Sequence, residues 1–458
     1  MERVTRAIPS IEQLRQRPGM QTLEEQFGRP AVVEALREEA AQWRQAATSG
    51  TTLPADLADA IAKALPARLA AARTGSLRGV INATGVIIHT NLGRAPLSAP
   101  AVQRVSAIAG GYSNLEYDLD RGARGKRDTH AHHLLSQLTG AENALVVNNN
   151  AAATLITLAA LAAGREVIVS RGEMVEIGGG FRIPDVMSQS GAILREVGTT
   201  NRTRASDYAA AISEKTALIL RVHPSNFRIE GFVERPSLAE LVTLGRKLNV
   251  PVAEDQGSGY LGFDEAPDAL REEPSVKRSV EEGADLVLFS GDKLLGGPQS
   301  GIIVGRESLI ASIRRHPLMR AVRADKMTYA ALEATLQAYA RERAAEIPVV
   351  RMILMSESEI DARAQQIVAR VQSADLHAAV ISGASTIGGG SAPGSAIPTR
   401  LIALSHDSLT ASQIEERLRK GHPPIIARIE QDRVVLDCRT VLPEQDEIVG
   451  SAISALSR

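Results

Sequence analysis

The sequence predicts an α/β fold with a mostly parallel central sheet, preceded by a small helical domain and followed by a smaller α+β domain. Two observations carry this prediction. Short apolar runs alternate with helical stretches from about residue 80 onward, and the residues before them are polar with helical periodicity. Strands buried on both faces of a parallel sheet read as such apolar runs. The length of 458 residues and 44% hydrophobic content suit about three domains with real cores.

Residues 1–75 form the predicted helical domain. Apolar residues recur at helical spacing from Leu14 to Trp43. Three or so helices are expected, with breaks at Pro9-Ser10, Gly28-Arg29-Pro30 and Ser49-Gly50.

The large domain, residues 76–330, contains the central sheet. Its predicted strands include residues 144–147, 167–169, 217–220, 251–253 and 285–289. Sheets of this type bind ligands at the carboxyl ends of their strands. The residues that follow each strand are therefore the first place to look for chemistry.

Residues 331–458 form the predicted α+β domain. A helical pattern over 327–347 ends before Pro348, and a second helix is expected over 357–373. Further strands are expected at 376–382, 399–405, 425–430 and 433–438, with a helix at 410–420. The segment 383–396 is rich in Gly, Ser and Ala, which predicts a mobile loop.

The amino-acid composition argues against several classes of function. The 52 basic and 53 acidic residues give a net charge of −1, which argues against a protein that coats DNA or RNA through bulk charge. A single cysteine, Cys438, cannot form an internal disulfide or a Cys-rich zinc site and suits a reducing compartment. The apolar runs are too short to span a membrane, and the charged N-terminus lacks a signal-peptide core. We expect a cytoplasmic protein that binds no membrane, no DNA and no metal ion.

Lys293 is one of only eight lysines and the one that best fits a reactive role. It follows a buried strand, Ser290 and Asp292, and it precedes Gly296-Gly297. A lysine desolvated among small residues can form a Schiff base with an aldehyde cofactor. Ser290 could bind a phosphate of that cofactor, and Asp292 could assist proton transfer or only orient the lysine. The alternative is a solvated lysine in a surface turn.

Two other strand ends support a cofactor site. Asp255 follows the strand at 251–253, where a carboxylate could keep a pyridinium nitrogen protonated. Asn149 and Asn150 follow another strand and begin a helix, and the N–H groups at such a start attract phosphate. The alternatives are an aspartate that caps a turn and an asparagine N-cap without a ligand.

The local sequences resemble the bacterial selenocysteine synthases, the L-seryl-tRNA(Sec) selenium transferase family, over nearly the whole chain from about residue 9. The stretches that carry the resemblance are Ile81–Gly85, His89–Arg94, Tyr112–Asp118, Arg121-Gly122, Val147–Ala152, Arg171–Glu173, Glu176–Gly179, His223–Phe227, Ser290–Gly297 and His316–Lys326. This resemblance implies a fold-type-I pyridoxal-phosphate (PLP)-dependent transferase.

By the same resemblance, Lys293 carries the cofactor and Asp255 binds the pyridine nitrogen. Asn149, Asn150 and Ser290 would lie near the cofactor phosphate, and Asn226 near the ring hydroxyl.

The resemblance further assigns Arg94, Arg320 and Arg323 to the selenium donor, selenophosphate. Guanidinium groups suit a small phosphate-like anion better than lysine does. Arg320 and Arg323 are three residues apart, so on a helix they would share a face. The alternative is that they are solvated surface arginines.

The implied activity is conversion of L-seryl-tRNA(Sec) to L-selenocysteinyl-tRNA(Sec), by β-elimination to dehydroalanyl-tRNA and selenium addition, in selenocysteine biosynthesis for selenoprotein translation. Residues 1–75 would read the tRNA. The family resemblance also implies a homo-oligomeric ring of dimers, a homodecamer, in which Arg94 serves a neighbour's Lys293. Two alternatives remain: a related PLP-dependent lyase acting on a free amino acid or amino sugar, and a catalytically silent paralogue that only binds tRNA.

Overall fold

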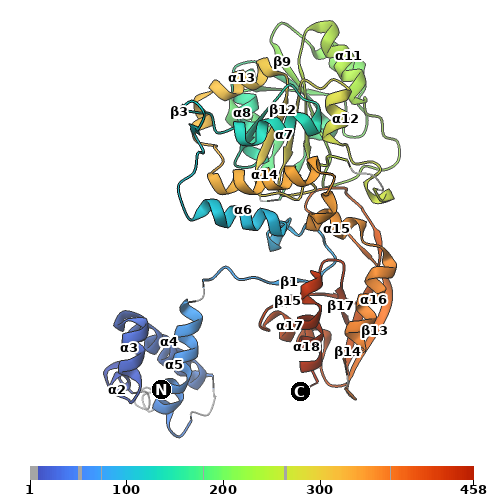
Figure 1. The fold of residues 1–458 in the computed structure, drawn as a ribbon. Coiled ribbons are helices and arrows are strands. Elements are labelled where there is room, and N and C mark those ends of the chain that lie inside the picture. Colours follow the sequence, from blue (N-terminus) through green and yellow to red (C-terminus); the bar gives the residue numbers. More distant parts are fainter. Residues whose placement is uncertain are drawn as a thin grey trace. The chain divides into compact units, whose positions relative to one another are not determined.

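The computed structural model describes residues 9–49, 54–73, 75–178, 180–262, 266–371 and 373–457, and it divides the chain into two compact units, residues 1–79 and 80–458 (Figure 1). Residues 1–8, Gly50 and Gly179, which entered the sequence predictions, lie outside the described residues. Within the described ranges, no helix is long and apolar enough to cross a membrane.

The first unit is a bundle of helices with a core of its own. Its helices are α2 (Ile11–Arg15), α3 (Met20–Phe27), α4 (Arg29–Thr48) and α5 (Leu57–Arg73). Ser10 caps α2 in a capping box with Gln13, and Pro30 lies in the first turn of α4, where proline fits a helix. Leu14, Leu36 and Leu65 are buried in the bundle core.

The second unit is built on a seven-stranded sheet in the order β4-β12-β11-β10-β9-β5-β8. The strands are β4 (Asn143–Val147), β5 (Glu166–Ser170), β8 (Ile193–Val197), β9 (Thr216–Val222), β10 (Val252–Gly257), β11 (Leu286–Ser290) and β12 (Gly301–Gly305). Every pair from β8 to β11 is parallel, and β12 is antiparallel to both of its neighbours. The predicted mostly parallel sheet is confirmed.

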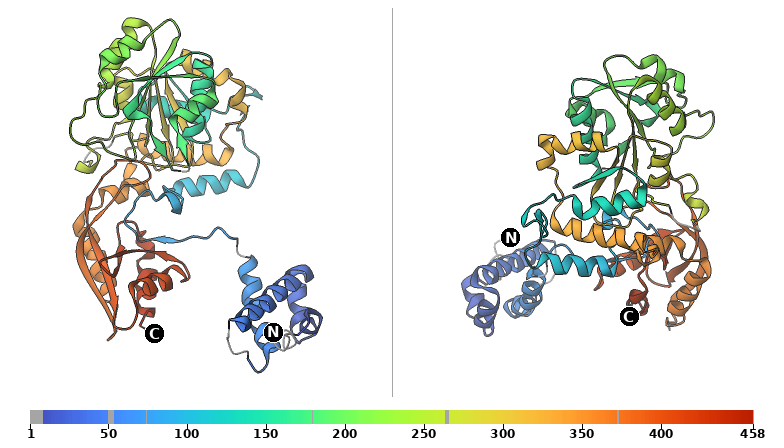
Figure 2. Two further views of the ribbon diagram at one scale, coloured as in Figure 1. Left: turned by 180° about the vertical axis from the view of Figure 1, so that it is seen from behind. Right: turned by 45° about the horizontal axis from the view of Figure 1, so that its top comes forward.

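Helices cover both faces of this sheet, as Figure 2 shows from two further directions. Alternate strand residues face two separate cores: Val146 and Ile168 pack into one, and Val147 and Val169 into the other. The first core is covered by α7 (Thr129–Thr139), α10 (Ala205–Ala211), α11 (Leu238–Leu248), α12 (Val276–Glu281) and α14 (Lys326–Ala340), with α6 (Ala99–Ala109) packed on α14. The second core is covered by α8 (Asn150–Ala162), α9 (Ile183–Ser190) and α13 (Glu307–Arg315).

The helix predicted over 327–347 is shorter in the structure, and this prediction is wrong at its end. α14 stops at Ala340, because Glu342 adopts a left-handed conformation with φ 58°. A 3₁₀ turn, η5 (Ala344–Glu346), follows. Pro348 then begins α15 (Pro348–Leu354) instead of ending a helix, since the first helical turn needs no N–H donor from it.

The C-terminal part has the predicted α+β character. An antiparallel sheet in the order β13-β14-β17-β16 is formed by β13 (Leu376–Ser385), β14 (Ile397–His406), β17 (Arg433–Asp437) and β16 (Arg428–Glu430). Its core is completed by α16 (Glu357–Val368), α17 (Ala411–Arg419) and α18 (Asp446–Ala455). The remaining short strands are β2 (Tyr117–Asp118), β3 (Ala123–Arg124), β6 (Glu176–Ile177) and β7 (Phe181–Arg182).

The start of the second unit is joined to this C-terminal part. β1 (Ile81–Asn82) pairs in parallel with β15 (Ile425–Ile426). Gly85 donates its N–H to Thr440 Oγ1 at 3.0 Å, and a Cβ at Gly85 would overlap the Asp437 carboxylate. The segment from residue 81 to residue 94 therefore starts from an anchor more than 300 residues away in sequence.

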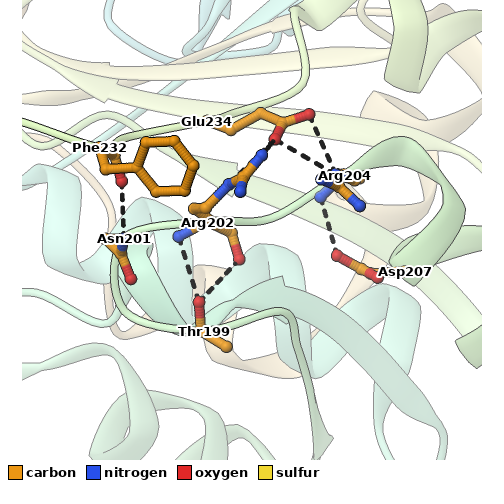
Figure 3. A network of polar contacts seen from close by, with 7 residues as sticks. All are labelled: Thr199, Asn201, Arg202, Arg204, Asp207, Phe232 and Glu234. Carbon is orange, nitrogen blue, oxygen red and sulfur yellow. Dashed lines mark hydrogen bonds and ion pairs between the residues drawn. The ribbon is translucent and has the colours of Figure 1, made fainter.

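A polar network fixes the long segment between β9 and α11 (Figure 3). Glu234 accepts hydrogen bonds from Arg202 and Arg204, and the Arg202 guanidinium lies 4.2 Å from the centre of the Phe232 ring. Asn201 donates to the Phe232 carbonyl at 2.6 Å. These contacts hold one end of a segment whose other end, His223–Asn226, emerges at the carboxyl edge of the sheet.

Substitution of Arg439 tests how much its buried hydrogen bonds stabilise the C-terminal core. Its guanidinium is buried and donates to the carbonyls of Met352, Met355 and Pro398. Arg439→Ala leaves these buried carbonyls without their donor and removes a cation that interacts electrostatically with the buried Asp437, so we expect the free energy of unfolding to fall by about 3–5 kcal/mol. Urea unfolding measures the change, and Arg433→Ala on β17, whose guanidinium contacts Gln431 at the surface, should cost far less. Equal losses would contradict this account.

Candidate active site

A cavity of about 280 Å³ lies at the carboxyl ends of β4, β10 and β11. It brings together most of the residues that the sequence singles out. Its lining consists of Arg94, Asn149, Asn150, Ala151, Ile177, Gly178, Asp255, Gly257, Ser290, Asp292, Lys293 and Gln299.

Lys293 is buried in this cavity, with 5% of its surface exposed. Its amine donates to the Gly390 carbonyl at 3.4 Å. Burial lowers the pKa of Lys293 below the usual lysine value; Arg94 acts in the same direction, while Asp255 and Asp292 oppose it. A lowered pKa leaves more of the amine neutral, which is the form that attacks an aldehyde or accepts a proton.

Asp255, on β10, is buried and held by two donors from α8. Its Oδ1 accepts from Asn150 Nδ2 at 2.8 Å, and its Oδ2 accepts from Thr154 Oγ1 at 2.9 Å. Burial raises the pKa of Asp255, whereas these hydrogen bonds and the nearby Lys293 lower it. The carboxylate is thus fixed in orientation close to a buried amine.

The structure gives Asn150 a contact that the sequence analysis did not foresee. Its amide donor binds Asp255, and its Oδ1 is buried with no hydrogen-bond partner among the described residues. Thr154 was missed altogether. The signal was its position four residues after Asn150, which places both on one face of α8.

The start of α8 can hold an anion. Asn149 caps the helix by accepting from the Ala152 N–H at 2.8 Å, and Ser290 lies at the end of the nearby β11. N–H groups in the first turn have no partner within the helix and favour phosphate. Gly301 on β12 lets this turn approach, because a Cβ there would overlap the Asn149 carbonyl. The cavity therefore fits PLP, with an amine, a carboxylate and a phosphate cup.

Arg94 reaches the cavity of its own chain. Its Nη1 donates to Asp292 Oδ2 at 2.7 Å, and its backbone is left-handed with φ 64°. Asp292 is buried and its carboxylate is engaged by this guanidinium. The structure therefore places Arg94 beside the Lys293 of the same chain, where the family resemblance placed it beside a neighbour's.

Arg320 and Arg323 do not line the cavity, and the prediction that they share a helix face is wrong. Arg320 is exposed at the end of a 3₁₀ helix, η4 (Pro317–Arg320). Arg323 lies beyond that helix, where it forms a β-bridge with Val147 and a 3.3 Å ion pair with Glu116. The helix ends too early for the two side chains to align.

The segment after β9 contributes to the rim of the site. Asn226 is exposed, and its amide donates to the Glu176 carbonyl at 2.8 Å. Ser225 is buried, and a Cβ added at Gly390 would lie 3.6 Å from both Ser225 Oγ and Lys293 Nζ. Ser225 and Gly390 are thus neighbours of the lysine that sequence reasoning did not select, although Ser225 lies in one of the stretches that carry the resemblance.

Thr154 provides a test of the carboxylate's environment. Thr154→Val removes one donor from Asp255 while burial remains, so the pKa of Asp255 should rise and PLP should bind about tenfold more weakly. Absorbance titration with PLP measures the affinity. Thr157→Val is a matched control, because Thr157 is buried on the same helix and its hydroxyl has no partner among the residues described. A similar loss in both variants would contradict a specific role for Thr154.

The chain is similar to known proteins over nearly its whole length. A family model described as "L-seryl-tRNA selenium transferase" matches residues 80–442, and one described as "Selenocysteine synthase N terminal" matches residues 6–44. An L-seryl-tRNA(Sec) selenium transferase of Geobacter metallireducens is 49% identical over 98% of both chains. One of Aquifex aeolicus is 44% identical over 100% of this chain and 99% of its own.

Among solved structures, a D-glucosaminate-6-phosphate ammonia-lyase covers 83% of this chain and 96% of its own, with a TM-score of 0.60 and 23% identity. This likeness concerns the fold alone.

Proposed function

Because the chain belongs to the L-seryl-tRNA selenium transferase family, we propose that it converts L-seryl-tRNA(Sec) into L-selenocysteinyl-tRNA(Sec) with selenophosphate as the selenium donor. The fold is that of the fold-type-I PLP enzymes, which confirms the predicted fold class. The observation that carries the proposal is the buried Lys293 beside the buried Asp255 in one cavity. The full-length similarity, helical N-terminal part included, favours this transferase over a lyase acting on a free amino acid or amino sugar.

The residues present suit PLP as the cofactor. Lys293 would bind its aldehyde, Asp255 its pyridine nitrogen, and Asn149, Ser290 and the first turn of α8 its phosphate. Asn150 would act chiefly through Asp255, and Asn226 from the rim. When bound, PLP supplies an electron sink for negative charge at the α-carbon of the seryl group.

Each cavity residue then has a separate task. The Lys293 amine, with its lowered pKa, would accept the α-proton of the seryl group. Gly390 O holds that amine when it is not bonded elsewhere. Asp292 would orient Arg94, whose guanidinium faces the cavity and can attract selenophosphate.

The selenophosphate site also supports an oligomer. Arg320 is exposed and Arg323 faces Glu116, so Arg94 is the one arginine that lines the cavity among the residues described for a single chain. A doubly charged anion is better held by several guanidinium groups. Dimers assembled into a ring, a homodecamer, would let a neighbour supply Arg320 and Arg323, and native mass spectrometry would give the ring size.

The substrate amino acid arrives as an ester and has no free carboxylate, so specificity must come largely from the tRNA. Residues 1–75 would read it, residues 76–330 would bind PLP, and residues 331–458 would form the small domain. Recognition of RNA by shape and sugar–phosphate contacts does not require a strongly basic protein. The reaction would take place in the cytoplasm.

Incubation of the purified protein with seryl-tRNA(Sec) and labelled selenophosphate tests the function directly. We expect selenium label on the aminoacyl group, because the site provides both a base and an anion site. If no label appears while free serine is deaminated, the protein is a lyase and the proposal fails.

The substitution Lys293→Ala tests whether Lys293 binds the cofactor. Removal of the amine should abolish the absorbance band of bound cofactor and lower the rate of selenium transfer by about 10³-fold or more. Lys277→Ala is the control, because this lysine is exposed on α12 and only approaches Glu281 at 4.0 Å. An absorbance band that survives Lys293→Ala would assign the cofactor to another lysine.

A further inference from the structure

We propose that Glu273 is a positioning residue: its carboxylate fixes the glycine turn at residues 388–390, and this turn places the Gly390 carbonyl against the Lys293 amine. The inference rests on the proposed function in one respect, the choice of Lys293 as the reactive amine.

Glu273 is a buried carboxylate that does not line the cavity around Lys293. Only 1% of its side chain is exposed. Its Oε2 accepts from the Ala392 N–H at 2.9 Å, and its Oε1 is buried with no hydrogen-bond partner among the residues that the structure describes. Taking a carboxylate out of water costs free energy, so its retention calls for a compensating interaction.

The turn that Glu273 holds has few internal contacts, such as the hydrogen bond from the Ser391 N–H to the Gly388 carbonyl at 3.1 Å. Gly388, Gly389 and Gly390 are all left-handed, with φ of 75°, 63° and 69°. Three consecutive glycines leave the backbone many alternatives. Ala392 is also left-handed, with φ 45°, which is unfavourable for a residue with a side chain. An external contact at Ala392 therefore selects one conformation.

The contacts continue from this turn to the lysine. Gly390 O accepts from Lys293 Nζ at 3.4 Å, two residues before the N–H that Glu273 binds. On its other side, Glu273 Oε2 lies 3.4 Å from His223 Nε2, and the His223 N–H donates to the Asp255 carbonyl at 2.9 Å. Glu273 thus lies where the glycine turn, the end of β9 and the segment after η3 (Asp268–Leu270) meet.

Glu273 also acts on Lys293 through its charge. Although burial dominates and lowers the pKa of Lys293, the Glu273 carboxylate is among the groups that raise it. Two substitutions separate the effect of the Glu273 hydrogen bond to the turn from the effect of its negative charge on Lys293. Glu273→Asp keeps the charge and shortens the reach, whereas Glu273→Gln keeps the reach and removes the charge.

Hydrogen exchange of the full-length protein, read by mass spectrometry over residues 386–396, tests the hydrogen bond. Glu273→Asp should raise exchange of this segment about tenfold, the size of one lost charge-assisted hydrogen bond, while Glu273→Gln, which keeps a neutral hydrogen bond, should raise it clearly less. The neighbouring Glu272, whose side chain is 84% exposed, gives the controls Glu272→Asp and Glu272→Gln, which should change nothing. Unchanged exchange in Glu273→Asp, or equal loosening in Glu272→Asp, overturns the proposal.

The pH midpoint of the cofactor's absorbance band tests the charge. Glu273→Gln should move the midpoint to lower pH, because a nitrogen cation at Lys293 loses a stabilising anion, and Glu273→Asp should leave it near wild type. If Glu273→Asp does not fold, hydrogen exchange over residues 386–396 in Glu273→Ala decides, and an unchanged rate overturns the proposal. A protein that shows both effects but transfers no selenium keeps this inference and loses the proposed function.

Discussion

The burial of Lys293 and Asp255 at the ends of neighbouring strands constrains the rest of the site. Each charge is unstable away from water, and burial shifts the two pKa values in opposite directions, toward the neutral form of each group. The structure counters this for Asp255 with two donors from α8. For Lys293 it supplies a backbone carbonyl from the glycine turn, and the carboxylates of Asp255, Asp292 and Glu273 raise its pKa.

These compensating groups come from two different parts of the fold. The donors to Asp255 lie on a helix that begins at the sheet edge, so the helix axis and the strand end fix them together. The acceptor for Lys293 lies in a turn between β13 and β14 of the small sheet. The Lys293 amine is therefore held both by the α/β core and by a turn that joins two strands of the C-terminal sheet, and its position depends on how well that turn is fixed.

Sequence reasoning found the site residues that lie directly at the end of an apolar run. Lys293, Asp255, Asn149 and Ser290 each follow an apolar strand, and parallel strands bring such ends together. It missed Gly390, because the contact with Lys293 joins residues 97 apart and depends on left-handed glycines that composition alone marks as a loop. It expected Arg320 and Arg323 to share a helix face, which spacing by three implies only if the helix continues past Arg320, whereas η4 ends there. The large sheet was predictable from its apolar runs; the early end of α14 was not, since it depends on the backbone of Glu342.

The parallel pairing of β1 with β15 has a consequence for synthesis of the protein. The segment that carries Arg94 is anchored by residues 425, 426 and 440, and the glycine turn belongs to a sheet that β17 completes. Strand pairs of such long sequence separation form late, and a chain emerging from the ribosome folds from its N-terminal end. Until residue 440 has been translated, a nascent chain that contains Lys293 and Asp255 lacks the anchors for the segment that carries Arg94 and the last strands of the sheet that carries the glycine turn. The arrangement thus makes completion of the cavity depend on synthesis and folding of the C-terminal sheet.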